Sequence, residues 1–202
     1  MPLSSNETLK AIKARRSIRL FAKQEVSDSD IRILLEAANE APSAHNQQSW
    51  RFIVLRNKRK QELAQLVVTK SGDFPRPAST LLRMAARSIS GAAAVIAIAN
   101  SGDLIRHGTQ LFKVKKEMAY DFFRTMEIQS SSAAVENLLL AGTSLGLAAV
   151  WLGILYLIKG EVLQFLGEPE GEFMAVVPIG YAVTSGQGPK KEPLEMKVKY
   201  VD

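Results

Sequence analysis

The sequence contains no cysteine and only two histidines, His45 and His107. Without cysteine the chain has no disulfide, no thiolate metal site and no cysteine nucleophile. Composition alone leaves room for a zinc ion held by both histidines and carboxylates, but no H-E-x-x-H helix or comparable ligand spacing supports one. We therefore expect no metal.

Charged residues are also absent from the whole stretch between Asn137 and Ile158. About 20 apolar residues are enough to span a bilayer. Polar residues and glycines interrupt this stretch, and its second half has the composition of a strand. We expect a buried helix that leads into a buried strand, with no membrane partner. The N-terminus carries no apolar signal core, so a cytoplasmic location is the default expectation.

Common phosphate and nucleophile fingerprints are absent or out of context. No G-x-x-x-x-G-K-[ST] loop occurs, and residues 186–189 open no strand-turn-helix unit. Residues 142–146 match G-x-S-x-G, but a helix leads into Ser144 and both histidines precede it, which a hydrolase elbow does not allow. Close helix packing at Gly142 and Gly146 is the simpler interpretation. Any bound phosphate must be held by side chains.

Length and charge narrow the number of domains and the kinds of partner that the chain can have. The 202 residues suit a single domain, 1–202, with a sizeable core. The net charge is +6, from 26 Lys and Arg against 20 Asp and Glu, which fits either nucleic acid or an anionic cofactor. The basic residues are not interleaved with aromatic ones, so we expect no nucleic-acid partner.

Hydrophobic spacing and turn residues predict alternating helices and strands. Ser5 would cap a helix over 6–14 with Leu9 and Ile12 inward, and Ser27 a second helix that ends near Ala41. Further helices are expected at 58–67, 77–90, 130–147 and 161–166, and strands at 50–55, 92–99, 148–158 and 173–181. The strand 92–99 is apolar enough to be buried on both faces. Residues 103–124 are poorly periodic, which leaves a helix and a mobile lid both open.

Two segments carry the clearest chemical signal. In A-R-R-S-I-R-L-F, residues 14–21, three arginines surround Ser17, and guanidinium forks with a hydroxyl are what a phosphate dianion requires. In A-P-S-A-H-N-Q-Q-S-W-R-F, residues 41–52, the amide side chains can both donate to and accept from the edge of a heterocycle. Together they indicate a bound nucleotide or flavin.

These segments resemble the nitroreductase family of FMN-dependent oxidoreductases. Its first pattern, R-[RH]-S-x-[RK]-x-[FY], is filled by Arg15, Arg16, Ser17, Arg19 and Phe21. Its second, A-P-S-x-x-N-x-Q-P-W, is filled by Ala41, Pro42, Ser43, Asn46, Gln48 and Trp50, with Ser49 in place of the usual proline. A helix of the type A-x-x-N-L begins at Ala134 and leads to W-L-G at 151–153, and P-I-G-Y stands at 178–181 before a basic pair, 190–191.

The resemblance implies an α+β fold with a central mixed or antiparallel sheet flanked by helices, in an intertwined homodimer. It implies an enzyme that takes hydride from NADH or NADPH through bound FMN to nitroaromatic, quinone or similar electron-poor acceptors. A specialised relative, such as an enone reductase, a dehalogenase or a flavin-destroying enzyme, remains an alternative. A protein that binds FMN or nucleic acid without catalysis is a second alternative.

The resemblance also implies roles for individual residues, with no catalytic side chain because the chemistry belongs to FMN. The phosphate would be held by Arg15, Arg16, Ser17 and Lys191, and Lys190 would also bind the cofactor. Arg19 would approach the pyrimidine side of the ring, and the Gly153 N–H would face flavin N5, with Trp151 and Leu152 beside it. The partner subunit would contribute Pro42, Ser43, Ala44, Asn46 and Gln48. Thr69 and Lys70 are candidates for the pyrimidine edge.

Overall fold

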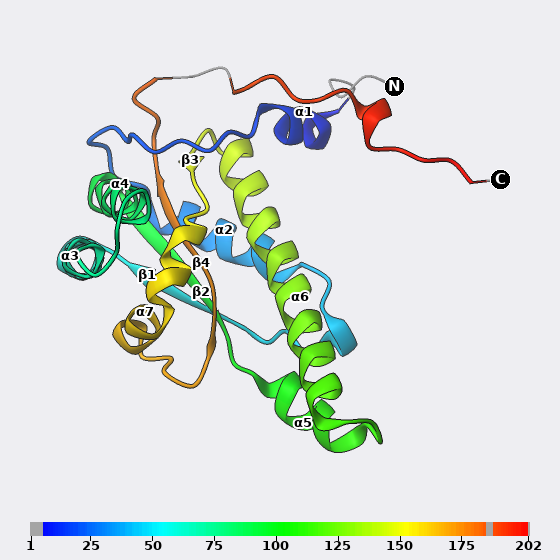
Figure 1. Ribbon diagram of the computed structural model, residues 1–202. Coiled ribbons are helices and arrows are strands. Elements are labelled where there is room, and N and C mark those ends of the chain that lie inside the picture. Colours follow the sequence, from blue (N-terminus) through cyan, green and yellow to red (C-terminus); the bar gives the residue numbers. More distant parts are fainter. Residues whose placement is uncertain (1–5, 185–187, 202) are drawn as a thin grey trace.

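The computed structural model describes residues 6–184 and 188–201. In these ranges helices cover both faces of a central sheet (Figure 1). The strands are β1 (Trp50–Leu55), β2 (Ala94–Asn100), β3 (Ala148–Ala149) and β4 (Glu172–Gly180). The α-helices are α1 (Glu7–Ala14), α2 (Asp28–Asn39), α3 (Asn57–Ser71), α4 (Ala78–Gly91), α5 (Asp103–Leu111), α6 (Lys116–Ser144) and α7 (Lys159–Leu166). Short 3₁₀ helices are η1 (Ala44–Asn46), η2 (Gly153–Ile158) and η3 (Leu194–Met196).

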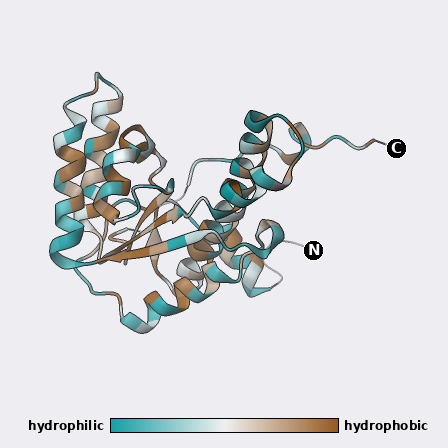
Figure 2. Ribbon diagram, turned by 90° about the horizontal axis from the view of Figure 1, so that it is seen from below, coloured by the Kyte–Doolittle hydropathy of each residue, from teal (hydrophilic) through white to brown (hydrophobic). Residues whose placement is uncertain are grey.

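The sheet has the order β1-β2-β4-β3, and each named strand pairs antiparallel with its neighbours. Every residue of β2 is buried, as the sequence predicts, and successive side chains alternate between two cores. Ile96 and Ile98 pack toward α2 and α6, whereas Val95 packs toward α3, α4, α7 and η2. Figure 2 shows hydrophobic strands between helices that are hydrophilic on part of their surface. The predicted α+β class is confirmed.

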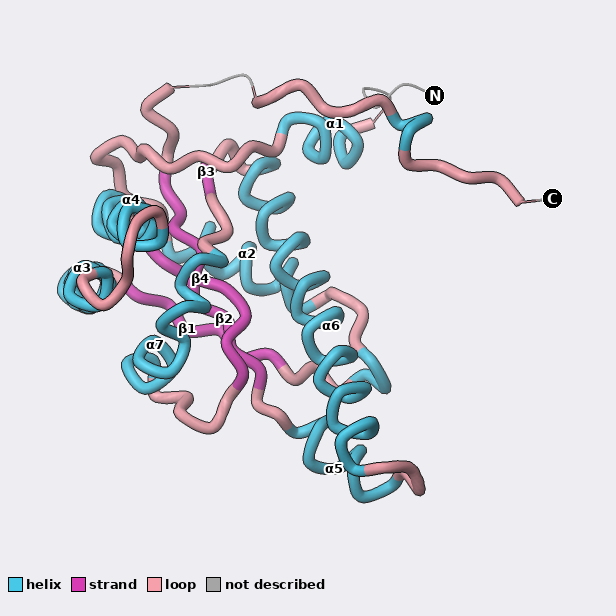
Figure 3. Tube along the Cα trace, in the orientation of Figure 1, coloured by secondary structure: helices cyan, strands magenta, loops and turns pink. Residues whose placement is uncertain are grey.

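The chain between α1 and α2 runs along the edge of this sheet as a loop (Figure 3). The Ile18 N–H donates to the Ala149 carbonyl at 3.0 Å, and the Ala22 N–H donates to the Tyr181 carbonyl at 2.8 Å. We call residues 15–22 the edge segment. Two strands that lie far away in the sequence thus fix its position.

Most predicted elements are found near their expected bounds, with corrections at the N-terminus. Ser27 caps α2 by accepting from the Asp30 N–H, as predicted. The cap of α1 is Asn6, whose side chain accepts from the Leu9 N–H at 2.9 Å, and the predicted cap Ser5 lies outside the described residues. Ile12 is 43% exposed, so the prediction that it faces inward was wrong.

The largest correction concerns residues 148–158, predicted as one strand. Only Ala148 and Ala149 pair as β3, and the chain then turns into η2. The apolar composition does not distinguish the two structures, because a 3₁₀ helix buries Leu155 and Ile158 as well as a strand would.

Residues 116–124 form the first part of α6 rather than a separate lid. The buried stripe there is Ala119, Phe123 and Glu127, spaced four residues apart. Only Ala119 and Phe123 of this stripe lie inside the segment that the sequence left open, and two apolar positions among charged residues do not establish a helical period.

The uncharged stretch 137–158 spans the end of α6, β3 and η2. Within the described ranges, no helix is long and apolar enough to cross a bilayer. Gly142 packs near Leu34 of α2, as expected for a small residue at a helix contact. Gly146 does not pack between helices, since it takes a φ of +72° just after α6 and so ends that helix.

Candidate functional site

A cavity of about 580 Å³ opens between the edge segment and the C-terminal tail. Its wall holds the predicted phosphate residues Arg15, Arg16, Ser17 and Lys191, with Arg19 and Lys190 beside them. The two sets are about 170 positions apart in the chain, so their meeting is a property of the fold. The prediction that they lie together agrees with this geometry.

The backbone at the end of α1 arranges the arginines. The Arg16 guanidinium donates to the carbonyls of Lys13 and Arg15, both at 2.7 Å. A Cβ at Gly188 would come within 2.7 Å of Arg16 Nε, so the tail lies directly against this side chain. Any larger residue at this position would have to displace the Arg16 side chain.

The cavity is strongly positive. Arg15 lies 3.8 Å from Glu136, an ion pair that is partly exposed. Within residues 6–184 and 188–201, no carboxylate lies within ion-pair distance of Arg16, Arg19 or Lys191. Unneutralised guanidinium and ammonium groups attract a multivalent anion.

A second cavity of about 190 Å³ adjoins the first and is largely apolar in its side chains. Trp151, Leu152 and Gly153 line it on one side, and Leu81, Met84 and Ala85 of α4 line it on the other. Arg19 lines both cavities. A ligand that joins an anionic group to a flat ring can therefore pass along the Arg19 side chain from one cavity to the other.

Gly153 has the properties that a close approach to a ring requires. It is the first residue of η2, so its backbone N–H has no acceptor within that helix. It is exposed, and a Cβ built on it would meet no protein atom within 4 Å. The donor set of cations, a hydroxyl and this N–H fits a flavin mononucleotide.

The predicted ring-contact loop 42–48 lies elsewhere in the chain. None of its residues lines either cavity. It packs beside the middle of α6, where the Ala44 N–H donates to Ser130 Oγ at 3.1 Å, whereas the edge segment lies near the opposite end of the sheet (Figure 1). Within one chain, the structure does not bring together the two segments that carry the sequence signal.

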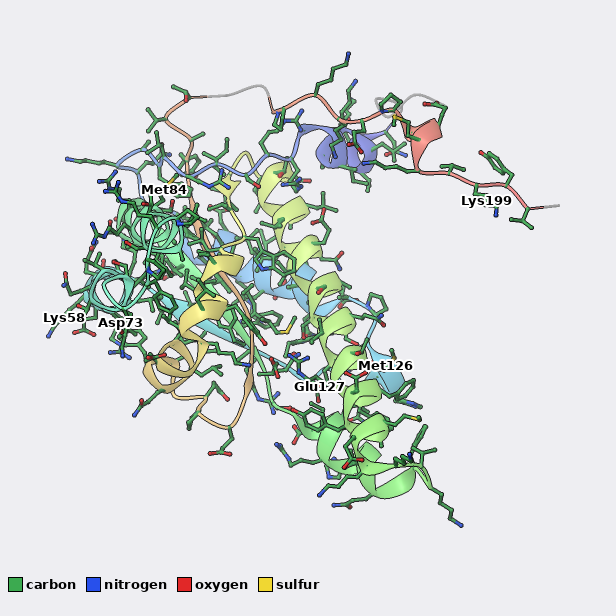
Figure 4. All side chains as sticks on the ribbon, viewed as in Figure 1. Lys58, Asp73, Met84, Met126, Glu127 and Lys199 are labelled. Carbon is green, nitrogen blue, oxygen red and sulfur yellow. The ribbon has the colours of Figure 1, made fainter. Side chains whose placement is uncertain are left out.

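Sequence reasoning missed the contribution of α4. Met84 lies on the side of this helix that faces the edge segment (Figure 4). The helix itself was predicted, but no residue in it marks a contact with a ring. The candidates Thr69 and Lys70 line neither cavity, and Lys70 instead forms an ion pair with Glu161 at 2.9 Å.

The two histidines are both exposed, His45 in η1 and His107 in α5. Among the residues that the structure describes, no group of three or more His, Asp or Glu side chains is placed to hold a metal ion. Ser144 donates to the Leu140 carbonyl at 3.1 Å within its own helix, so the G-x-S-x-G match is part of a helix end.

Comparisons with known proteins identify the family. The family model described as "Nitroreductase family" matches residues 12–181. Two proteins named "Putative NADH dehydrogenase/NAD(P)H nitroreductase" are similar along most of the chain. The one from Archaeoglobus fulgidus is 34% identical over 87% of this chain and 85% of its own, and the one from Methanothermobacter thermautotrophicus is 31% identical over 89% and 79%.

A solved structure gives the same result for the fold. A nitroreductase with bound FMN from Desulfitobacterium hafniense superimposes with a TM-score of 0.70 and 27% identity, over 98% of this chain and 99% of that one. The resemblance drawn from four short motifs therefore extends along the whole chain. The chain belongs to the nitroreductase family of oxidoreductases.

Proposed function

We propose that the protein is a homodimeric, FMN-dependent NAD(P)H oxidoreductase that reduces nitroaromatic, quinone or similar electron-poor acceptors. The observation that carries this proposal is the position of Arg19, which lines both the cationic cavity and the cavity beside Trp151–Gly153. FMN has a dianionic end and a flat ring end, and this pair of cavities matches both. The proposed acceptor class rests on the family alone.

The residues of the chain would bind and orient FMN rather than transfer protons. Arg15, Arg16 and Ser17, with the two tail lysines, would neutralise the phosphate. Arg19 would stabilise negative charge on the ring, and the Gly153 N–H would donate at its edge. When bound, FMN supplies the hydride chemistry between the nicotinamide and the acceptor.

The homodimer is supported by the separation of the two motif segments. The loop 42–48 resembles a flavin-contacting segment, yet it lines neither cavity of its own chain. A second copy could bring its loop to the first copy's cavities without any change in fold. Two FMN sites per dimer then follow from symmetry.

The cationic residues favour a small phosphate ligand over nucleic acid. They line a recessed cavity, whereas a nucleic-acid backbone requires an extended basic surface. We further propose that residues 1–202 act as one FMN-binding domain in the cytoplasm. One sheet shared by both cores supports the single domain, and the cysteine-free composition supports the location.

The test is to purify the protein and record its visible absorption, then to add NADH or NADPH without oxygen. We expect a yellow protein whose band near the flavin maximum bleaches and returns on addition of a quinone or nitroaromatic compound. Chromatography of the flavin released by heat distinguishes FMN from FAD. A colourless protein that takes up no added FMN would contradict the proposal, as would salt-sensitive DNA binding without flavin.

A further inference from the structure

The loop 44–49 has a costly backbone conformation. His45, Asn46 and Gln48 have φ values of 52°, 54° and 48°, in the left-handed region that residues other than glycine rarely adopt. Three such residues within four positions persist only where other contacts hold them. The question is which contacts of this chain hold the loop.

Helix α6 holds the beginning of the loop through Ser130. This side chain is 8% exposed, and its hydroxyl donates to the Met126 carbonyl at 2.7 Å. That bond directs its lone pairs outward, where Oγ accepts from the Ala44 N–H at 3.1 Å. Ser132, two residues further along, also donates to a carbonyl one turn back, but it forms no bond to the loop.

The end of the loop meets α6 at Glu127, one turn before Ser130. The Glu127 side chain is 1% exposed and lies on the side of α6 that faces the end of the sheet (Figure 4). Its Oε1 accepts from the Leu104 N–H at 2.9 Å, which fixes the start of α5. The Ser49 hydroxyl lies near the same carboxyl group, and the Ser49 carbonyl accepts from the Ser101 N–H at 2.8 Å.

One contact of this arrangement, that of the Ser49 hydroxyl, comes from a residue that departs from the family pattern. The pattern has proline where this chain has Ser49, and proline has neither a hydroxyl nor a backbone N–H. Burial raises the pKa of Glu127, whereas the N–H groups of α5 and the Ser49 hydroxyl oppose that shift. Burying a carboxyl group is unfavourable, so its retention here indicates a positional role.

Two other buried polar residues complete the cluster. Ser131 donates to the Asn100 side-chain carbonyl, and Asn100 ends β2 beside the start of β1. Glu127 Oε2 and Asn100 Nδ2 have no partner among the described residues. The cluster thus connects α6 with the sheet, with α5 and with the loop.

From these contacts we infer that Ser130 and Glu127 are positioning residues for the flavin site: from α6 they anchor the two ends of the loop 44–49, at Ala44 and at Ser49. The inference rests on the proposed function, because it assumes that this loop contacts flavin. Neither residue touches the cavities, so both act through the loop. The interaction also couples α5 to the loop, so that displacement of one disturbs the other.

The test compares Ser130→Ala with Ser132→Ala, a matched control that loses the same kind of helix bond without a loop contact. Hydrogen exchange of the flavin-free protein, read by mass spectrometry, reports on the loop directly. We expect amides 44–48 to exchange about tenfold faster in Ser130→Ala than in Ser132→Ala, the effect of one lost hydrogen bond. FMN titration should show about tenfold weaker binding in the first variant only, at a melting temperature within about 5 °C of that of the second variant.

Glu127 is tested by rescue. Glu127→Gln keeps an acceptor for the Leu104 N–H and should match the unchanged protein in loop exchange and FMN affinity, whereas Glu127→Ala should loosen the loop as Ser130→Ala does. Equal exchange and equal FMN affinity in Ser130→Ala and Ser132→Ala would overturn the inference even if Glu127→Ala did not fold. If the unchanged protein binds no FMN, the proposed function fails. The exchange experiment uses the flavin-free protein, so it still tests whether Ser130 holds the loop, and the two failures can be told apart.

Discussion

Ser17 lies opposite Ala149 in a short parallel bridge, closed by the bond from the Ile18 N–H to the Ala149 carbonyl at 3.0 Å. This bridge connects the residues that line the cationic cavity to the chain that continues through Trp151 to Gly153. The distance between the proposed phosphate and ring sites is therefore set by backbone pairing, which side-chain substitutions leave intact.

The cationic cavity predicts that charge controls FMN retention. We expect Arg15→Ala and Lys191→Ala each to weaken FMN binding about ten- to hundredfold, because a charged hydrogen bond contributes about 1.5–3 kcal/mol. Fluorescence titration at two salt concentrations measures this. Lys58→Ala, on the outer side of α3 and distant from the tail (Figure 4), is the control and should bind normally. Equal losses in all three variants would contradict the assignment.

Arg19 should control the potential of the flavin more than its retention. A cation beside the ring favours the reduced, anionic form, so Arg19→Ala should shift the midpoint potential to more negative values, on the order of 30 mV. Arg19→Lys, which keeps the charge, should shift it less. A reductive titration with a reference dye measures both. If Arg19→Ala alters retention alone, its assigned place at the ring is wrong.

A substitution at Gly153 should affect FMN binding but not the stability of the fold. Space beside it is open in the protein, so Gly153→Ala should change the free energy of unfolding by less than about 1 kcal/mol. The new methyl group would nevertheless enter the cavity beside Trp151 and weaken FMN binding. Gly160→Ala in α7, where space is also open, should leave binding unchanged. Unfolding and FMN titrations of both variants decide the point.

Glu127 gives a pH dependence with a defined sign. Burial raises its pKa above the ordinary value of 4.5, so the folded state binds the proton more tightly than the unfolded state does. Stability from this group is complete below pH 4.5 and falls as pH rises through the raised pKa. Glu127→Gln stays neutral and should lack this decline.

The measurement is the melting temperature of both proteins from pH 4 to pH 8. Asp103 of α5 also faces Glu127, and it lies 3.6 Å from Arg51 of β1 and forms an ion pair with Arg106. These groups are present in both proteins, so the difference between the two curves isolates Glu127. Parallel curves would show that its titration does not contribute.

Local chemistry made the edge segment and β2 predictable. The arginines and Ser17 are close together in sequence, so the sequence alone indicates a phosphate site. The continuous apolar run of β2 is typical of a strand that is buried on both faces. The course after Ala149 was not predictable, because burial of Leu155 and Ile158 is met equally by a strand or a 3₁₀ turn. The α4 wall of the ring cavity was missed because Met84 and Ala85 are ordinary helix residues whose role comes from the fold.

The distance between the loop 42–48 and the cationic cavity has a consequence for how the protein behaves on dilution. In the proposed homodimer, each flavin contacts two chains and so acts as a ligand of the associated state. By mass action, flavin then strengthens association and association strengthens flavin binding. Cofactor content therefore becomes a function of protein concentration, and a dilute sample loses colour and partner together.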